Sequence, residues 1–217
     1  MIYEKKYETP FPVIEVSLRQ HESICIEPGT MVYSDPYLSF QTMHNSTRQK
    51  RTGGKRVGFF SQGNKLITIL TAQHPARVAI APCVPGDIIE LYCDDHANQQ
   101  WQIIGGAFLA CDMNVNFELI QSSWAGVFSG GLMIPILETS GTGSCIVDSC
   151  GVLQKFNLNG QKVIDVDTNH LVAWSKGLQY QTFQERSGAL WTEFRARFHG
   201  VGSVIVQSNC RIAPVAK

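Results

Sequence analysis

Three seven-residue segments of this chain resemble one another, and they constrain the fold more than any other feature. They are residues 29–35, 106–112 and 169–175, so their starts lie 77 and 63 residues apart. Each begins at a glycine or an asparagine, continues into an apolar run, and lies between two stretches with strand-like character. Recurrence of this kind indicates that one structural unit is repeated along the chain.

A second pair of segments, residues 141–149 and 200–208, sets the phase of the repeat. Both contain a Gly-x-Gly turn followed by an apolar run, and their starts are 59 residues apart. Residues 74–82 stand at the same place in the first copy without the two glycines. Because glycine permits the positive φ of tight turns, we expect a hairpin turn at the Gly-x-Gly segments.

The phased segments divide residues 1–217, taken as one domain, into three predicted units. A unit of about 65 residues buries its own core poorly, whereas three units packed together bury it well. We therefore expect an all-β chain of three units with pseudo-threefold symmetry, each a β-sandwich or short double-stranded β-helix. The predicted units are residues 11–82, 83–149 and 150–210.

Alternation of apolar and polar residues supports the all-β prediction along most of the chain. Residues 23–26, 37–40, 66–70 and 115–119 alternate or form short β-branched runs, bounded by glycine, proline, asparagine or aspartate. The best helical candidate, residues 188–198, fits strand alternation at least as well.

The composition limits the classes of partner. The 217 residues include 18 Lys and Arg and 18 Asp and Glu, so the formal net charge is zero. A neutral chain has no global attraction to nucleic acid or to an anionic membrane. Charged residues make up 17% of the chain, below the roughly 25% typical of soluble domains. This low charge leaves more surface for contacts between subunits.

The lack of a recognisable targeting signal and the cysteine usage lead us to expect a cytoplasmic location. Residues 1–7 are charged and lack the apolar core of a signal peptide. The sequence also contains no run of 18 apolar residues, the length needed to span a membrane. The seven cysteines form no C-x-x-C, so we expect mostly buried free thiols in a reducing compartment. Cys145 and Cys150 could form a zinc or disulfide pair, but the repeat places Cys145 on a core strand and favours an apolar thiol.

The repeated segments resemble the altered-inheritance-of-mitochondria-24 family, also called the DUF124 group. The similarity spans about residues 15–208, nearly the whole chain. It implies the fold of the tryptophan RNA-binding attenuation protein (TRAP), present three times in one chain. It also implies a homotrimer, with nine units in a ring, and no assigned reaction. The matching pieces are residues 27–35, 81–87, 105–110, 141–143 and 167–174.

Motif searches give no catalytic residues, no metal ligands and no cofactor. The six histidines form no H-x-H, H-E-x-x-H or H-x-x-E-H pattern, and no Walker pattern occurs. No G-x-S-x-G is present. Ser129 precedes two glycines, but it aligns with Ser61 in another predicted pre-hairpin loop, which favours a structural turn. We therefore expect no enzymatic activity.

Two features break the repeat and are candidates for ligand binding. The loop of residues 44–56 holds five Lys or Arg and no acid, where the family is often glycine-rich. It could bind phosphate, RNA or lipid headgroups with a salt-dependent affinity, or it could simply be solvated. His170 could line a central axis or a subunit interface, or it could be a hydrogen-bonded turn residue. The candidates are Arg48, Lys50, Arg51, Lys55, Arg56 and His170.

Three hypotheses for function follow from the sequence. The first is a non-enzymatic assembly or scaffold protein that acts as a homotrimer. The second is a ligand- or nucleic-acid-binding module that uses clefts between repeats or the basic loop of residues 48–56. The third is an unrecognised enzyme that depends on a metal.

Overall fold

The computed structural model is all-β, as the sequence predicts. It describes residues 1–6, 10–44, 66–120, 136–187 and 191–210. Within these residues the chain forms strands joined by turns, with one short 3-10 helix, η1, over Thr168–His170. No helix of the described residues is long and apolar enough to cross a membrane.

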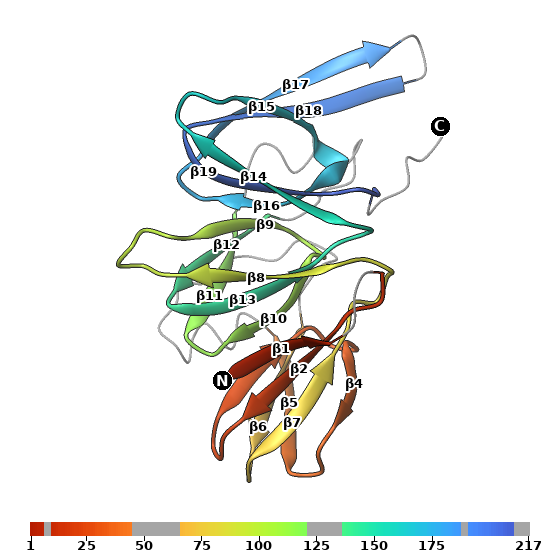
Figure 1. The fold of residues 1–217 in the computed structure, drawn as a ribbon, viewed down its shortest axis with the longest axis vertical. Coiled ribbons are helices and arrows are strands. Elements are labelled where there is room, and N and C mark those ends of the chain that lie inside the picture. Colours follow the sequence, from red (N-terminus) through yellow and green to blue (C-terminus); the bar gives the residue numbers. More distant parts are fainter. Residues whose placement is uncertain (7–9, 45–65, 121–135, 188–190, 211–217) are drawn as a thin grey trace.

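The strands follow β1 (Ile2–Lys6) in three successive groups, which lie one after another along the longest axis of the molecule (Figure 1). The first group is β2 Val13–Leu18, β3 Ser23–Ile26, β4 Met31–Ser34, β5 Leu38–His44, β6 Leu66–Ala72 and β7 Ala76–Ile80. The second group is β8 Ile88–Cys93, β9 Trp101–Ile104, β10 Phe108–Asp112, β11 Val115–Ile120, β12 Ile136–Gly141 and β13 Gly143–Asp148. The third group is β14 Leu153–Asn159, β15 Ile164–Asp167, β16 Leu171–Ser175, β17 Gln179–Ser187, β18 Trp191–His199 and β19 Val201–Gln207.

Each group divides its strands between two antiparallel sheets in the same way. The first, third and sixth strands belong to one sheet, and the second, fourth and fifth strands belong to another. The two middle sheets are shared between groups, because β3 pairs with β10 and β9 pairs with β16. We call these the two inter-group pairs. The four sheets have the orders β1-β2-β7-β4, β5-β6-β3-β10-β13-β8, β11-β12-β9-β16-β19-β14 and β15-β18-β17.

The third strand of each group has an irregular register at the same place. The register of strand pairing skips one residue of each third strand. The skipped residues are Val32 where β4 pairs with β7, Leu109 where β10 pairs with β13, and Val172 where β16 pairs with β19. An extra residue of this kind is a β-bulge, which bends the strand locally. The three segments that resemble one another in sequence therefore share one local geometry, and their residues can be compared position by position.

A side chain at or just after the end of each third strand bonds to the sixth strand of the same group. In each group this side chain accepts a hydrogen bond from a backbone N–H at or beside the start of the sixth strand. The bonds join Asp35 to Arg77, Asp112 to Ser144 and Ser175 to Ser203, at 2.8, 2.8 and 2.9 Å.

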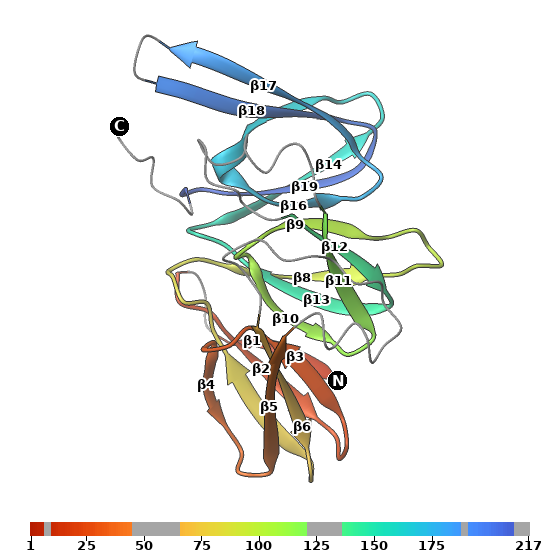
Figure 2. The ribbon, with the colours of Figure 1, turned by 180° about the vertical axis from the view of Figure 1, so that it is seen from behind.

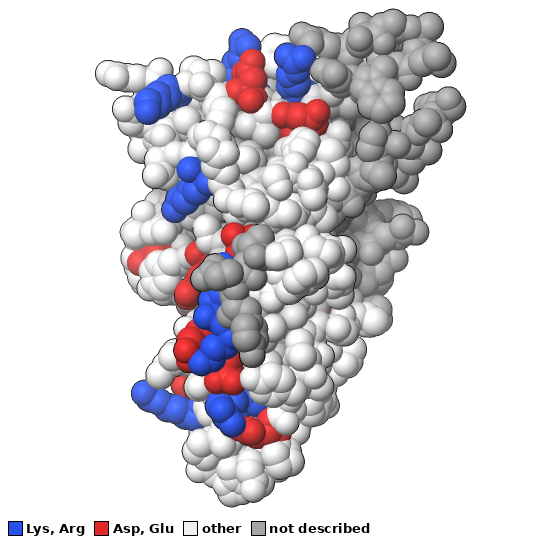
Figure 3. Space-filling view, turned by 45° about the vertical axis from the view of Figure 1, so that its right-hand side comes forward, with Lys and Arg blue, Asp and Glu red and all other residues white. Residues whose placement is uncertain are grey.

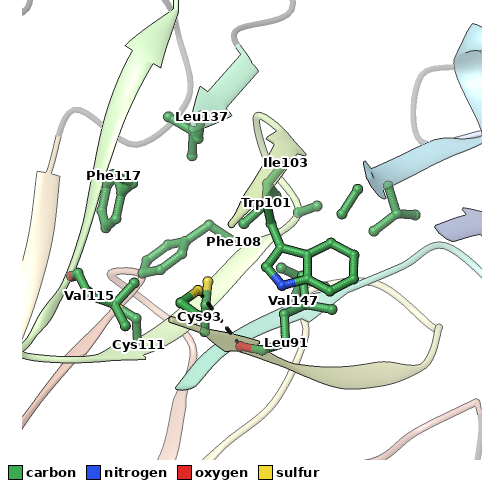
Figure 4. Packing of buried hydrophobic residues seen from close by; sticks show 14 of the residues in the cluster. Leu91, Cys93, Trp101, Ile103, Phe108, Cys111, Val115, Phe117, Leu137 and Val147 are labelled. Carbon is green, nitrogen blue, oxygen red and sulfur yellow. Dashed lines mark hydrogen bonds between the residues drawn. The ribbon is translucent and has the colours of Figure 1, made fainter. Parts of the chain in front are cut away.

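Figure 4 shows the packed side chains of the second group's core, which is continuous with the neighbouring groups. The rings of Phe108 and Phe117 lie 4.7 Å apart between the two sheets. Trp101 is buried and its indole N–H donates to the carbonyl oxygen of Tyr92 at 2.9 Å. The same core includes buried side chains from both other groups, so the groups do not pack as separate bodies. These side chains are Cys25, Ile67, Val172, Ala173 and Ile205.

The N-terminal strand β1 links the first group to the second. The Tyr3 hydroxyl donates a hydrogen bond to the Asp112 carboxylate, and Lys5 forms a 2.6 Å ion pair with Asp87. Burial and this nearby carboxylate raise the pKa of Tyr3, so the hydroxyl keeps its proton and stays a donor.

The helical candidate near residue 190 is a strand in the structure. β18 pairs with β17 from Trp191 to His199. Ala196 and Phe198 are buried while Arg197 between them is exposed, which is the two-residue period of a strand with one face on the core. The pseudo-threefold symmetry of the units stays a prediction.

Gly141 and Gly160 form a matched pair that tests the turn geometry. Both have φ near +90°, at +91° and +87°, which strains any residue with a Cβ. A Cβ at Gly141 would also lie 2.0 Å from the Asn114 carbonyl oxygen, whereas at Gly160 the nearest atom is a Val201 methyl at 3.6 Å. Gly141→Ala should therefore lower the free energy of unfolding by about 1–3 kcal/mol more than Gly160→Ala. Denaturant titration measures both losses, and equal losses would contradict this steric account.

Candidate functional site

The basic-loop candidates Arg48, Lys50, Arg51, Lys55 and Arg56 lie outside the residues that the structure describes, as does Ser129. Among the described residues, no group of three or more His, Cys, Asp or Glu is placed to hold a metal ion.

The other ligand-binding candidate, His170, lies at the end of η1 and contacts the end of β19. Its Nδ1 lies 2.8 Å from the Gln207 carbonyl oxygen, and its Nε2 lies 3.3 Å from Cys210 Sγ. The Gln207 side chain reaches back to the same turn, where it donates to the Asn169 carbonyl oxygen at 3.2 Å. Both ring nitrogens thus have a neighbour within the third group. A ligand-binding role for His170 stays a prediction.

The buried cysteines are free thiols placed in the sheets. Cys25, Cys111 and Cys145 lie opposite one another on the adjacent strands β3, β10 and β13. Cys145 is buried and Cys150 is half-buried, and neither forms a disulfide. Burial raises the pKa of Cys93 to about 11, so this thiol is protonated at neutral pH. These side chains act as small apolar residues.

Two strands, β4 and β15, are the last strands of their sheets although their counterparts in the other groups lie inside sheets. β4 ends the first sheet, whereas β10 and β16 lie inside six-stranded sheets. β15 ends the fourth sheet, whereas β3 and β9 lie inside. We call β4 and β15 the end strands. They belong to the groups at opposite ends of the molecule, as the reverse view also shows (Figure 2).

The end strand β4 exposes apolar side chains at positions that are buried in its counterparts. Val32 at the bulge is 55% exposed, and Tyr33 after it is 49% exposed. Exposed apolar side chains on the outermost strand of a sheet mark a surface suited to pairing with another strand. The matching residues in β10 and β16 are Leu109, Ala110, Val172 and Ala173, all of them buried.

The end strand β15 combines apolar and charged side chains. Val166 is buried in the third group's core, with Ile164 packed against that core. Arg197 donates from Nε and Nη2 to the two oxygens of Asp165, each at 2.6 Å, and this lowers the pKa of the Asp165 carboxyl. On the face shown in Figure 3, acidic and basic side chains likewise lie next to one another in mixed clusters.

Sequence reasoning did not single out the two end strands. One signal for β4 was present in the aligned segments, because Tyr33 stands where the other two segments have Ala110 and Ala173. A large half-polar side chain at a position that is otherwise alanine indicates a different environment.

Comparisons with known proteins agree with the fold. A family model described as mitochondrial biogenesis AIM24 matches residues 3–209. An uncharacterized protein of Streptococcus pyogenes serotype M6 is 28% identical over 214 residues, which cover 91% of this chain and 82% of that protein. The crystal structure of a Streptococcus pyogenes protein, a structural genomics target, has a TM-score of 0.74 at 22% identity. That match covers 96% of this chain and 94% of the other.

The burial of the thiols predicts their order of reaction with a thiol reagent at pH 8. Exposed Cys83 should react first, and half-buried Cys150 and Cys210 should follow more slowly. Peptide mapping by mass spectrometry identifies each labelled site, and the denatured chain, in which all seven should react, is the control. Rapid labelling of Cys93 in the folded protein would contradict its raised pKa and burial. The thiols expected to react only on unfolding are Cys25, Cys93, Cys111 and Cys145.

Proposed function

The chain belongs to the mitochondrial biogenesis AIM24 family, and we propose that it is a non-enzymatic assembly protein that acts as a homotrimer. The observation that carries this proposal is the end strand β4, with Val32 and Tyr33 about half exposed where the counterparts are buried. Burying one such side chain contributes about 1.5–3 kcal/mol. The streptococcal relative is called uncharacterized, so its name gives no activity.

The two end strands favour another copy of the same chain as the binding partner. One chain carries both of them, in groups at opposite ends of the molecule (Figure 1). A contact between different surfaces of identical chains closes into a ring or continues as a filament. A ring of three chains leaves neither end strand exposed. It also agrees with the nine-unit ring that the family resemblance implies.

The finer features of the fold are part of the same proposal. We propose that the three strand groups are three TRAP-like units. The support is that the bulge at Val32, Leu109 and Val172 and the division of strands between two sheets occur in every group.

The proposal of a non-enzymatic, cytoplasmic protein rests on how the reactive side chains are used. The Cys93 thiol has a raised pKa, and both ring nitrogens of His170 have neighbours in the fold. Seven free cysteines are typical of a reducing compartment.

Light scattering coupled to size-exclusion chromatography at micromolar concentration tests the trimer. The proposal predicts a species of three times 24.1 kDa. Val32→Asp should weaken formation of the trimer by at least about tenfold, because a carboxylate would replace a valine that the contact between chains buries. Val201→Asp is the matched control, since Val201 is 73% exposed but lies on β19 rather than on an end strand. A wild-type chain that stays at the monomer mass would contradict the proposal.

A further inference from the structure

We propose that β15 of one chain pairs antiparallel with β4 of the next, at the register that both inter-group pairs already use. This inference rests on the proposed self-association and deepens it by naming the two surfaces that meet. Val166 would lie opposite Tyr33 of the second copy, and Asp165 would lie opposite its Ser34. Each end strand then pairs with an end strand of a second copy of this chain.

The two inter-group pairs within the chain supply the template. In both, the second strand of one group lies beside the third strand of the next group, and the contact begins at the first residue after the bulge. The same relation therefore joins the first group to the second and the second to the third. The opposed residues are Ile26 and Ala110, Cys25 and Cys111, Ile24 and Asp112 in one pair, and Ile103 and Ala173, Gln102 and Trp174, Trp101 and Ser175 in the other.

The register of the proposed pair follows from position within the groups. Tyr33 is the first residue after the bulge of β4, as the template requires. Val166 lies three residues before Asn169, and the matching residues of β3 and β9 lie three residues before Gly29 and Gly106. Val166 is buried, like those two residues, and faces the core of its own group. The third group's second strand is thus built like the two that already have a partner of this kind.

The packing of the cores supports the same pairing. The first group's core includes Leu109 and Ala110 from the second group. The second group's core includes Val172 and Ala173 from the third group. The first and second cores are therefore each completed by the bulge residue and the residue after it from the following group.

Among the described residues, no group follows the third one within the chain. The residues that match this completing pair are Val32 and Tyr33, both of them exposed on β4. A second copy would place them against the third core, where Val166 and Leu171 are buried. One contact would thus cover the exposed apolar side chains of one chain and extend the core of another.

Each inter-group pair has three sets of directly opposed residues, and we compare the middle set. In both of these pairs, and in the proposed pair between chains, the two middle residues are chemically suited to each other. Cys25 and Cys111 are both buried thiols. Across β9 and β16 the Trp174 indole N–H donates to the Gln102 side-chain oxygen at 2.7 Å. The proposed pair brings a hydroxyl, on Ser34, opposite the Asp165 carboxylate, which has acceptor positions beyond the two bonds from Arg197.

A disulfide cross-link between chains tests the register. The test variant carries Ser34→Cys and Asp165→Cys in a Cys83→Ser background, which removes the exposed native thiol. Directly opposed residues of an antiparallel pair have Cβ atoms about 4.5–5.5 Å apart, close enough for a disulfide after mild oxidation. The matched control pairs Ser34→Cys with Lys162→Cys, which precedes β15 and lies about 10 Å from residue 165 along an extended chain. Each single variant is a second control, because pairing of β4 with β4 or of β15 with β15 would link it.

The proposed register predicts a shift of most of the double variant from 24.1 kDa to covalent species of two and three chains. Peptide mapping should place the bond between residues 34 and 165, and the off-register control and single variants should stay unlinked. A second in-register pair, Asp35→Cys with Ile164→Cys, covers the case in which the first variant does not assemble. If the wild-type chain assembles and neither in-register pair gives its bond, the register is overturned while the homotrimer proposal stands. If the wild-type chain is a monomer, both are overturned.

Discussion

Backbone pairing between strands of neighbouring groups is the interaction on which the rest of this structure depends. Where β3 meets β10 and β9 meets β16, two three-stranded sheets become one six-stranded sheet. The pairing satisfies the backbone groups of four strands and carries side chains of one group into the core of the next. The third strand of the second and third groups completes the core of the group before it. No group precedes the first among the described residues, so the corresponding side chains of β4, Val32 and Tyr33, stay exposed.

The backbone geometry of these contacts is shared, while their side-chain chemistry differs. One inter-group pair opposes two thiols, and the other opposes an indole and an amide. In the proposed contact between chains a hydroxyl would oppose a carboxylate. Partner choice depends on differences in affinity, so distinct side chains at one geometry favour each strand meeting its own partner. The same distinction would direct β15 towards β4 of a second copy.

The sequence predicted the parts of the fold that depend on local pattern. Ser23–Ile26 has the strand bounds expected from alternation next to turn residues. β1 was missed, because Glu4, Lys5 and Lys6 give no apolar pattern and the strand forms by pairing with β2.

The candidate site was not predictable from periodicity. The alternation around Val32 is the same whether or not a neighbouring strand covers β4, and only the strand order of the sheets shows which strand is last. His170 lies at the end of η1. Its contact with Cys210 joins residues 40 positions apart and depends on the packing of η1 against the end of β19.

Hydrogen–deuterium exchange of the wild-type protein at micromolar concentration tests the central claim most directly, because it reports whether another chain covers β4. The peptides to compare are those covering β4, its counterpart β10, and β17, which also ends its sheet. If β4 pairs with a second copy, its amides should exchange as slowly as those of β10, and dilution to the monomer should speed their exchange. Exchange of β4 as fast as that of β17, and unchanged by dilution, would contradict the account.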